Sequence, residues 1–200
     1  PKPQTPNPKP QPLTFRRSNI SLWLSNKLMR PLTDEEITIV LEKLKKFLGV
    51  NLKTMLDEDS KDAIVVFRII GKKVYIMSSS LVKFANIFAK EKTLHVGSYL
   101  GQFSKKGKFR LGITALSILS KYSTSKVWLK SSGEQNYLYG NHGLAAHIAR
   151  ISDNAIKNNG VILYTLSNIP LGFGVMAKAT HELKDTNPSS IFVYTLCDSG

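Results

Sequence analysis

Thr33-Asp-Glu-Glu-Ile-Thr-Ile-Val-Leu-Glu-Lys-Leu-Lys-Lys-Phe-Leu-Gly49 carries the clearest structural signal in this sequence. Thr33 and Glu36 have the spacing of a capping box, in which each side chain accepts a hydrogen bond from the backbone N–H of the other residue. Lysines near the C-terminal end suit the helix dipole, and Gly49 is placed to end the helix. Apolar residues recur at helical spacing, at Ile37, Val40, Leu41, Leu44 and Leu48. The stretch therefore predicts an amphipathic helix with one apolar face.

The segments that follow this helix predict a mixed domain. Two β-rich runs, 62–70 and 74–78, flank Gly71-Lys-Lys73 and read as a hairpin. A helix is expected over 79–89, two more strands over 93–103 and 108–113, and a short helix over 114–121. We therefore predict an α+β domain, an antiparallel sheet with helices, over 29–122.

A different pattern begins after the polar break Ser123-Thr-Ser125. Glycines that signal turns are frequent from here to the end of the chain. Short strands are expected at 126–130, 160–166, 171–178 and 191–196, with a helix and a turn over 133–150. Several short strands with one helical insertion predict a small, β-barrel-like domain over 123–200.

The first 28 residues lack these signals. Six of the nine prolines lie within residues 1–12, where they favour an extended, solvated chain. Residues 15–28 combine Arg, Ser and apolar residues without an acid, as a mitochondrial targeting peptide also does. We interpret residues 1–28 as a disordered, basic extension upstream of the domain, with a targeting peptide as the alternative.

The charge of the chain is high and uneven. There are 28 Lys and Arg residues against 14 Asp and Glu, a net charge of +14. Residues 1–28 contribute +5, residues 29–122 contribute +8 and residues 123–200 only +1. Such an excess is typical of proteins that bind polyanions, and nucleic acid is the first candidate; a basic surface that only aids solubility is the alternative. The densest basic stretch, 83–110, contains Lys83, Lys90, Lys92, Lys105, Lys106, Lys108 and Arg110.

Enzyme chemistry finds little support in the sequence. The single cysteine, Cys197, excludes an internal disulfide and a cysteine-based zinc site, and it reads as a buried thiol. Gly172-Phe-Gly174 lacks the third glycine of a nucleotide-binding loop and predicts close packing in a small barrel. No apolar run is long enough to cross a membrane. We therefore predict no catalytic residue, no metal, no cofactor and no membrane association.

From Met29 onward the chain resembles one family. The segments that carry the resemblance are Met29-Arg-Pro-Leu-Thr33, Lys108-Phe-Arg-Leu111 with Thr114-Ala-Leu116, Val127-Trp-Leu-Lys130, Leu138-Tyr-Gly-Asn-His142 and Asn168-Ile-Pro-Leu-Gly-Phe-Gly-Val175. Together they are similar to the Nip-seven (nuclear import protein seven) family of large-subunit ribosome biogenesis factors. Members of that family begin near Met29 and continue past a stretch like Asp198-Ser-Gly200, so residues 1–28 look like an extension and a short tail is expected beyond Gly200.

The resemblance implies a fold and an RNA-binding surface. It implies that 123–200 form a PUA domain, which in such families grips RNA near its first helix, the glycine turn after it and a neighbouring strand. On this sequence that surface maps to Tyr139, Gly140, Asn141 and His142, with Lys178 and Lys184 as nearby cations. Asn or His can bond a base edge or a phosphate, and Tyr139 can stack on a base or serve only in packing.

Two features shift the expected phosphate contacts to the first domain. Leu144-Ala-Ala-His147 stands where many relatives carry a basic residue and a glycine, and the PUA segment is nearly neutral. Because phosphate neutralisation usually dominates affinity, the expected phosphate contacts are Lys105, Lys106, Lys108 and Arg110.

The function expected from this reading is a non-catalytic, RNA-binding factor for pre-rRNA processing and assembly of the 60S subunit. Its expected partners are pre-rRNA, including U-rich single strands, and pre-ribosomal proteins. We expect a monomer in the nucleus and nucleolus, with some in the cytoplasm. The alternative is a protein-interaction scaffold within pre-ribosomal particles that contacts RNA only incidentally.

Overall fold

The first helix forms as its capping box predicts. The computed structural model describes residues 29–57, 65–85, 96–153 and 155–200, with only the backbone described over 83–85. Helix α2 spans Asp34–Leu48, Thr33 is its N-cap, and Gly49 ends it with a φ of 54°. Val40, Leu44, Phe47 and Leu48 are buried, whereas Ile37 and Leu41 are only half-buried. The buried face is therefore shifted from the predicted one toward Phe47.

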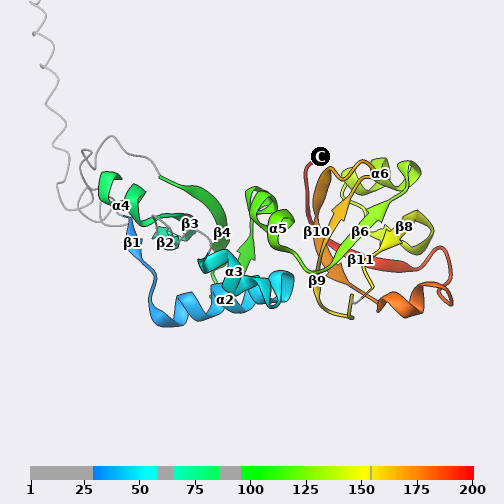
Figure 1. Cartoon of the computed structure of the whole chain (residues 1–200), viewed down its shortest axis with the longest axis horizontal. Coiled ribbons are helices and arrows are strands. Elements are labelled where there is room, and N and C mark those ends of the chain that lie inside the picture. The colour runs from blue at the N-terminus through cyan, green and yellow to red at the C-terminus, as the bar shows by residue number, and fades with distance from the viewer. Residues whose placement is uncertain (1–28, 58–64, 86–95, 154) are drawn as a thin grey trace, which may run out of the picture.

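A five-stranded antiparallel sheet, sheet A, forms the body of the first half of the chain (Figure 1). Its strand order is β1-β2-β3-β4-β5, so every strand pairs with its neighbour in sequence. The strands are β1 (Arg30–Pro31), β2 (Val65–Ile70), β3 (Lys73–Ser78), β4 (Ser98–Phe103) and β5 (Phe109–Leu111). Both predicted hairpins are confirmed within these ranges, whereas 62–64 and 93–95 lie outside the described residues.

Helices flank this sheet. They are α3 (Asn51–Asp57), α4 (Ser79–Ala85), a 3₁₀ turn η2 (Ile113–Ala115) and α5 (Leu116–Tyr122). The helices predicted over 79–89 and 114–121 are confirmed in the described residues, but α3 was not predicted. A residue far along the chain holds the start of α3 in place, because Asn51 donates its side-chain N–H to the Tyr122 carbonyl at 2.9 Å.

Sheet B occupies the second half of the chain and is a nearly closed barrel. Its order is β7-β11-β10-β9-β6-β8, and β6 pairs with β9 in parallel. The edge strands β7 and β8 are joined only by the 3₁₀ turn η3 (Ala145–His147), so the two edges must lie close together. The strands are β6 (Lys126–Leu129), β7 (Gly143–Leu144), β8 (Ile148–Ile151), β9 (Gly160–Tyr164), β10 (Pro170–Met176) and β11 (Ile191–Asp198); helix α6 (Ser131–Leu138) and the turn η4 (Thr180–Leu183) complete it.

One prediction in this half is right only in part. The helix and turn expected over 133–150 are present as α6 and the turn at Gly140, but the rest of the range was wrong, because it contains β7 and the start of β8 at Ile148. The strand is four residues long and is held by pairing with β6, in which Trp128 lies opposite Arg150. Because this strand depends on a partner some twenty residues away, its own sequence has almost no pattern that predicts it.

Part of the core crosses from the first half of the chain into the barrel, while a second apolar cluster lies within the barrel itself. One apolar cluster joins Leu44 and Phe47 of α2 to Ile162 of β9 and Phe173 of β10. The Phe47 and Phe173 rings meet edge to face, with centroids 5.6 Å apart. Phe47 also rests on Gly160, where an added Cβ would collide with its ring. The boundary expected between 122 and 123 stays a prediction; one shared cluster crosses it, and the barrel keeps a second cluster of its own.

None of the helices in the described ranges is both long and apolar enough to cross a bilayer. This statement covers only those parts of the chain.

We predict that Phe47 and Gly160 are energetically coupled. Phe47→Ala should lower the free energy of unfolding by about 3–5 kcal/mol, because it leaves a cavity between the two halves. Gly160→Ala should cost about 1–3 kcal/mol through overpacking against the Phe47 ring. Urea denaturation of Phe47→Leu, of Gly160→Ala and of the double variant that carries both substitutions measures the coupling.

The control for this cycle is Val50→Ala, because Val50 is 83% exposed. It should change the free energy of unfolding by no more than about 0.5 kcal/mol. Strict additivity of the Phe47→Leu and Gly160→Ala effects would contradict the contact.

A second prediction concerns acid stability. Arg30 donates two hydrogen bonds to Glu36, at 2.8 and 2.7 Å, and these bonds are the main reason that the pKa of Glu36 is lowered. A lowered folded-state pKa stabilises the protein above the unfolded-state value near 4.5, and this contribution is lost as pH falls through the folded-state pKa. Glu36→Gln should therefore destabilise the protein at pH 7 and much less at pH 3.

Urea unfolding at the two pH values checks this prediction. Arg30 is half exposed, so solvent screening limits the effect at pH 7 to under about 1 kcal/mol. Glu42→Gln, at an exposed position on the same helix, should show no such pH-dependent difference. Equal destabilisation by Glu36→Gln at both pH values would mean that the ion pair contributes nothing.

Candidate nucleic-acid interface

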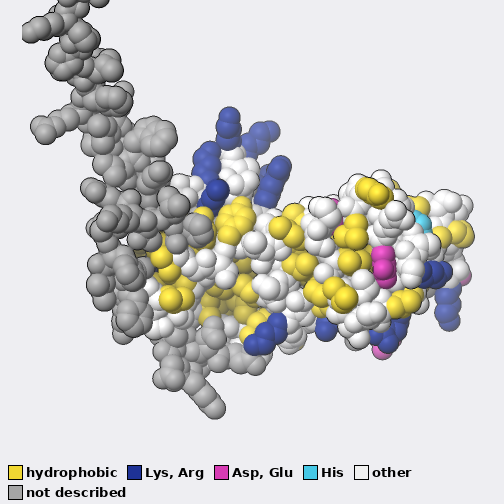
Figure 2. Space-filling view, turned by 90° about the horizontal axis from the view of Figure 1, so that it is seen from above, with side chains coloured by type: hydrophobic (Ala, Val, Ile, Leu, Met, Phe, Trp, Pro, Cys, Tyr) yellow, Lys and Arg dark blue, Asp and Glu magenta, His cyan; other side chains and the backbone are white. Residues whose placement is uncertain are grey.

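Two hairpin turns bring six cations together at one end of sheet A. The Phe103 N–H donates to the Lys72 carbonyl at 2.8 Å, which ties the β2–β3 turn to the β4–β5 hairpin. Lys73 lies opposite Gln102, and Gln102 lies opposite Arg110, so the three side chains are neighbours across the strands. Figure 2 shows dark blue side chains projecting together from one edge of the molecule. The hairpin-tip patch consists of Lys72, Lys73, Lys105, Lys106, Lys108 and Arg110, and all six are exposed.

The β4–β5 turn holds its lysines on an ordered backbone. Ser104 accepts the Lys108 N–H on its hydroxyl at 3.1 Å, and the Ser104 N–H donates to the Lys108 carbonyl at 2.8 Å. Gly107 has a φ of 75°, a left-handed conformation that glycine adopts without strain. None of the six cations forms an ion pair with an acid in the described parts of the chain. Within the described residues, no acid offsets their positive charge.

Sequence reasoning found four members of this patch and missed two. Lys72 and Lys73 were read only as turn residues, because their place beside Lys105 depends on the pairing of β3 with β4. From the predicted basic stretch 83–110, Lys90 and Lys92 lie outside the described residues. The side chain of Lys83 is not described either.

The turn after α6 is built mainly by its own hydrogen bonds. The N–H of Gly140 donates to the Tyr137 carbonyl at 3.0 Å, and Gly140 has a φ of 82° with open space where a Cβ would stand. Asn141 donates its side-chain N–H to the carbonyl and side-chain oxygens of Asn136, at 3.1 and 2.7 Å. The side-chain N–H group of Asn141 thus helps to shape the turn. Tyr139 is 77% exposed, so its ring is free of core packing and can meet a ligand.

Strand β11 supplies an aromatic surface next to this turn. The register between β10 and β11 shifts at Phe173–Gly174, which leaves one extra residue, Leu196, on β11. Tyr194 and Leu196 are both exposed. Tyr194 meets the His142 ring edge to face, with centroids 5.4 Å apart. Tyr194 is a further surface residue that the sequence analysis missed, because the β11 prediction did not say which face is inward.

Thr195 locks the turn to β11. Its hydroxyl donates to the Asn141 carbonyl at 2.9 Å, and its N–H donates to Nδ1 of His142 at 3.4 Å. Because Nδ1 accepts, a neutral His142 carries its proton on Nε2. His142 therefore presents a donor at its exposed edge.

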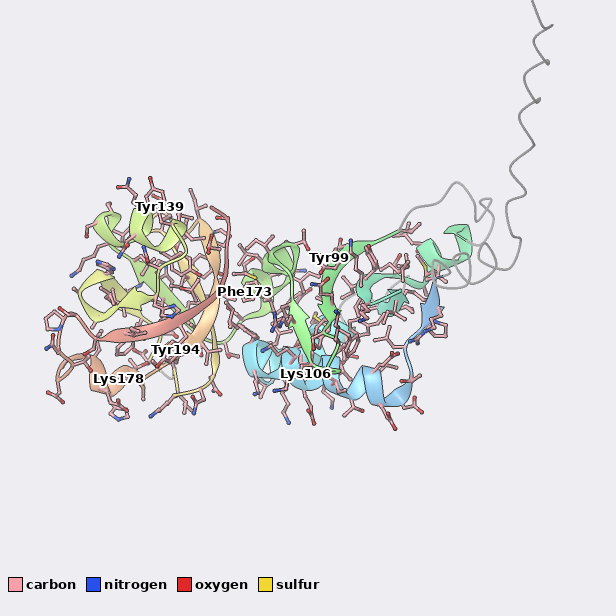
Figure 3. The ribbon with its side chains drawn as sticks, turned by 180° about the vertical axis from the view of Figure 1, so that it is seen from behind. Tyr99, Lys106, Tyr139, Phe173, Lys178 and Tyr194 are labelled. Carbon is pink, nitrogen blue, oxygen red and sulfur yellow. The ribbon has the colours of Figure 1, made fainter. Side chains whose placement is uncertain are left out.

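The predicted site residues do not all come together. Figure 3 shows Tyr139 at the upper end of the barrel, Tyr194 on β11, and Lys178 at the lower end. Lys178 is half-buried and donates to the Thr186 hydroxyl at 3.2 Å, and Lys184 is exposed just after η4. Lys178 is thus placed away from Tyr139. Lys106 lies on the other half of the molecule, on the side toward which β11 also faces in Figure 3.

Cys197 is half-buried, and its thiol faces the Leu111 carbonyl at 3.7 Å. Burial, with a smaller effect from Asp198, raises the pKa of this thiol. It therefore stays protonated at neutral pH and is a poor nucleophile. The described residues hold no cluster of three or more His, Cys, Asp or Glu that would suit a metal ion. Gly172 and Gly174 pack against β11 where a side chain would not fit, as predicted for a small barrel.

These features define the class. A barrel whose first helix, following turn and last strand share one surface, preceded by an α+β domain, is a PUA-domain protein with an N-terminal partner domain. Comparison with known families agrees. A model described as the NIP7/UPF0113 pre-PUA domain matches residues 29–113, and one described as the UPF0113 PUA domain matches residues 125–200.

The chain belongs to the NIP7/UPF0113 family. A protein of Tetraodon nigroviridis named "60S ribosome subunit biogenesis protein NIP7 homolog" is 44% identical over 172 residues, which cover 86% of this chain and 94% of its own length. The protein of the same name from Danio rerio is 42% identical with the same coverage. The Nip-seven resemblance seen in the sequence is thereby confirmed.

Solved structures show the same fold. A hypothetical protein of Pyrococcus horikoshii aligns with a TM-score of 0.55 at 15% identity, covering 86% of this chain and 95% of that one. A PUA-domain protein of Aeropyrum pernix aligns with a TM-score of 0.52 at 13% identity, covering 86% and 88%. The α+β and PUA barrel architecture expected from the sequence is therefore confirmed.

Proposed function

We propose that this protein is a non-catalytic, RNA-binding assembly factor that acts in pre-rRNA processing and in biogenesis of the 60S subunit. The observation that carries the proposal is the 44% identity to a 60S biogenesis protein across both halves of the chain. The PUA barrel and the exposed cations of the hairpin-tip patch, which have no acidic partner among the described residues, supply the physical means of holding RNA.

In the proposed mode of binding, one surface neutralises phosphates and another contacts bases. The hairpin-tip patch neutralises phosphates, since lysines and arginine without acidic partners attract a polyanion at long range. The surface around Tyr139, His142 and Tyr194 contacts unpaired bases, because exposed aromatic rings stack on bases that a duplex would hide. β11 and Lys106 face the same side of the molecule in Figure 3, so one RNA strand can reach both.

The proposed setting follows from the same role. Partners are pre-rRNA, including U-rich single strands, and proteins of the pre-ribosomal particle. The protein works as a monomer in the nucleus and nucleolus, with some in the cytoplasm. No chemical step is assigned to it, because its residues position RNA and do not transform it.

The patch is tested by the salt dependence of binding. In a Lys105/Lys106/Lys108/Arg110→Ala variant, affinity for a uridine octamer should fall. The slope of log K against log salt should become shallower by about 0.7 for each phosphate that the variant no longer neutralises. Fluorescence anisotropy of a labelled octamer at several salt concentrations measures both quantities.

The matched control removes four exposed lysines elsewhere, Lys45, Lys46, Lys53 and Lys157. It changes the net charge equally and should leave most of the slope intact. If the two variants behave alike, the patch makes no specific contact. Cross-linking to pre-rRNA tests the wider proposal: absence of specific sites would favour a protein scaffold instead.

Base contact is tested at Tyr194. Tyr194→Ala should weaken octamer binding by about 1–3 kcal/mol if one base stacks on the ring, with little change in the salt slope. Tyr194→Phe keeps the ring and should bind like the parent. Thermal unfolding should be nearly unchanged in both variants, because Tyr194 is 47% exposed. Full affinity in Tyr194→Ala would remove β11 from the interface.

A further inference from the structure

Two large aliphatic side chains are exposed on one tight turn of the barrel. The turn joins β9 to β10, and it carries Leu166 and Ile169, each 58% exposed. Single exposed apolar residues are common on protein surfaces, but two on one short turn form a small patch. Leu166 and Ile169 together are the turn patch. It is separate from the surface around Tyr139, His142 and Tyr194 that is proposed above to contact bases.

Other groups of the turn set its conformation. The Thr165 N–H donates to the Ile169 carbonyl at 2.9 Å, and the Ile169 N–H donates to the Thr165 hydroxyl at 3.1 Å. Asn168 has a left-handed φ of 62°, and its side-chain oxygen accepts the Trp128 indole N–H at 2.7 Å. The side chains of Leu166 and Ile169 take no part in these bonds and are mostly outside the core. The fold therefore does not require apolar residues at these two positions, and the turn presents them to solvent on an ordered backbone.

A basic cavity lies beside the turn patch. Its volume is about 330 Å³, it lies between α5 and the barrel, and it is lined by Asn168 and Pro170 of the turn and by Lys126 of β6. Among the described residues, no Asp or Glu lines it. Arg150 adds a second charge, because its guanidinium lies 3.8 Å from the centre of the Trp128 ring, which also lines the cavity. Neither cation forms an ion pair with an acid in the described ranges, so the surface combines aliphatic groups with positive charge.

This combination favours a protein segment over a nucleotide. A base binds by stacking on an open aromatic ring, but the Trp128 ring is covered by Tyr164 from β9 and by Arg150 from β8. The exposed apolar groups are aliphatic instead, and they pack well against aliphatic side chains of a partner. The neighbouring cations are complementary to carboxylates. A segment that carries both aliphatic and acidic side chains matches the whole surface.

We propose that the turn patch and the cavity form a docking site for an acidic, aliphatic segment of a pre-ribosomal protein. Leu, Ile or Val side chains of the segment cover Leu166 and Ile169, and a neighbouring Asp or Glu enters the cavity and pairs with Lys126. Apolar anchors beside charged groups of this kind are typical of protein–protein interfaces. The proposal rests on the proposed role in pre-ribosomal particles, but it concerns a surface distinct from the one assigned to RNA.

Photo-cross-linking identifies what covers the turn patch. A tagged full-length variant, Leu166→p-benzoylphenylalanine, is isolated within its pre-ribosomal particles and irradiated. Mass spectrometry should map the main product to a protein segment in which Asp or Glu lies next to Leu, Ile or Val. The matched control is Val50→p-benzoylphenylalanine, because Val50 is 83% exposed on the turn between α2 and α3. The control should not yield this product.

The mapped segment is then made as a labelled peptide, and fluorescence anisotropy measures its binding to the purified full-length protein. Leu166→Ser with Ile169→Ser should weaken binding by at least about tenfold, because the aliphatic contact is lost. Lys126→Glu should weaken it by a similar factor, whereas Lys126→Arg should stay within about threefold of the parent. Val50→Ser with Ile156→Ser removes two exposed apolar side chains elsewhere and should bind like the parent. Circular dichroism checks that every variant is folded.

The outcomes separate this site from the proposed function. Absence of the protein from pre-ribosomal particles would contradict the proposed function and remove the partner that the docking site requires. If the protein is in the particles and binds a uridine octamer, but Leu166 cross-links only to RNA, to a segment without Asp or Glu, or to nothing, the docking site alone is overturned. Equal peptide affinity of the parent and the Leu166→Ser/Ile169→Ser variant overturns it as well.

Discussion

The packing of Phe47 into the barrel is the constraint on which the rest of the structure depends. Its ring fills the space that Gly160 leaves open and meets Phe173 edge to face. Around it, the Thr124 N–H donates to the Phe47 carbonyl at 3.4 Å. Close packing of this kind does not slide, because a small displacement would weaken the dispersion attraction of many atoms at once. The α+β half and the barrel therefore behave as one body.

Because of this packing, surfaces formed by residues that are far apart in sequence keep a fixed separation. The hairpin-tip patch is fixed to sheet A, and Tyr194 is fixed to β11, so their separation is set by the shared core and not by a linker. An RNA strand that touches both then binds with little loss of protein freedom, which favours affinity. The cavity beside Trp128 exists for the same reason, since α5 forms one wall and the barrel forms the other.

Local signals in the sequence were enough wherever the interactions are local. The capping box at Thr33, the Gly71 hairpin turn and the Ser104–Gly107 turn each form bonds within a few residues, and the structure contains all three. Short elements that are stabilised by residues far along the chain were not predicted from the sequence. β8 depends on β6, and α3 depends on a bond from Asn51 to Tyr122. The motif at Leu138–His142 located the turn, but Tyr194 beside it belongs to a strand that carries no recognisable motif.

By itself, the sequence determined the class of fold, the family, and the concentration of charge in the first half of the chain. Patterns of helix capping, hydrophobic alternation and turn residues can be recognised in the sequence because they act between residues that are close along the chain. Only the tertiary structure decided which cations gather and which stay apart. It places Lys72 and Lys73 beside Lys105, whereas Lys178 lies at the far end of the barrel. Strand pairing and domain packing set those positions, and both bring together residues whose separation along the chain carries no trace of their contact.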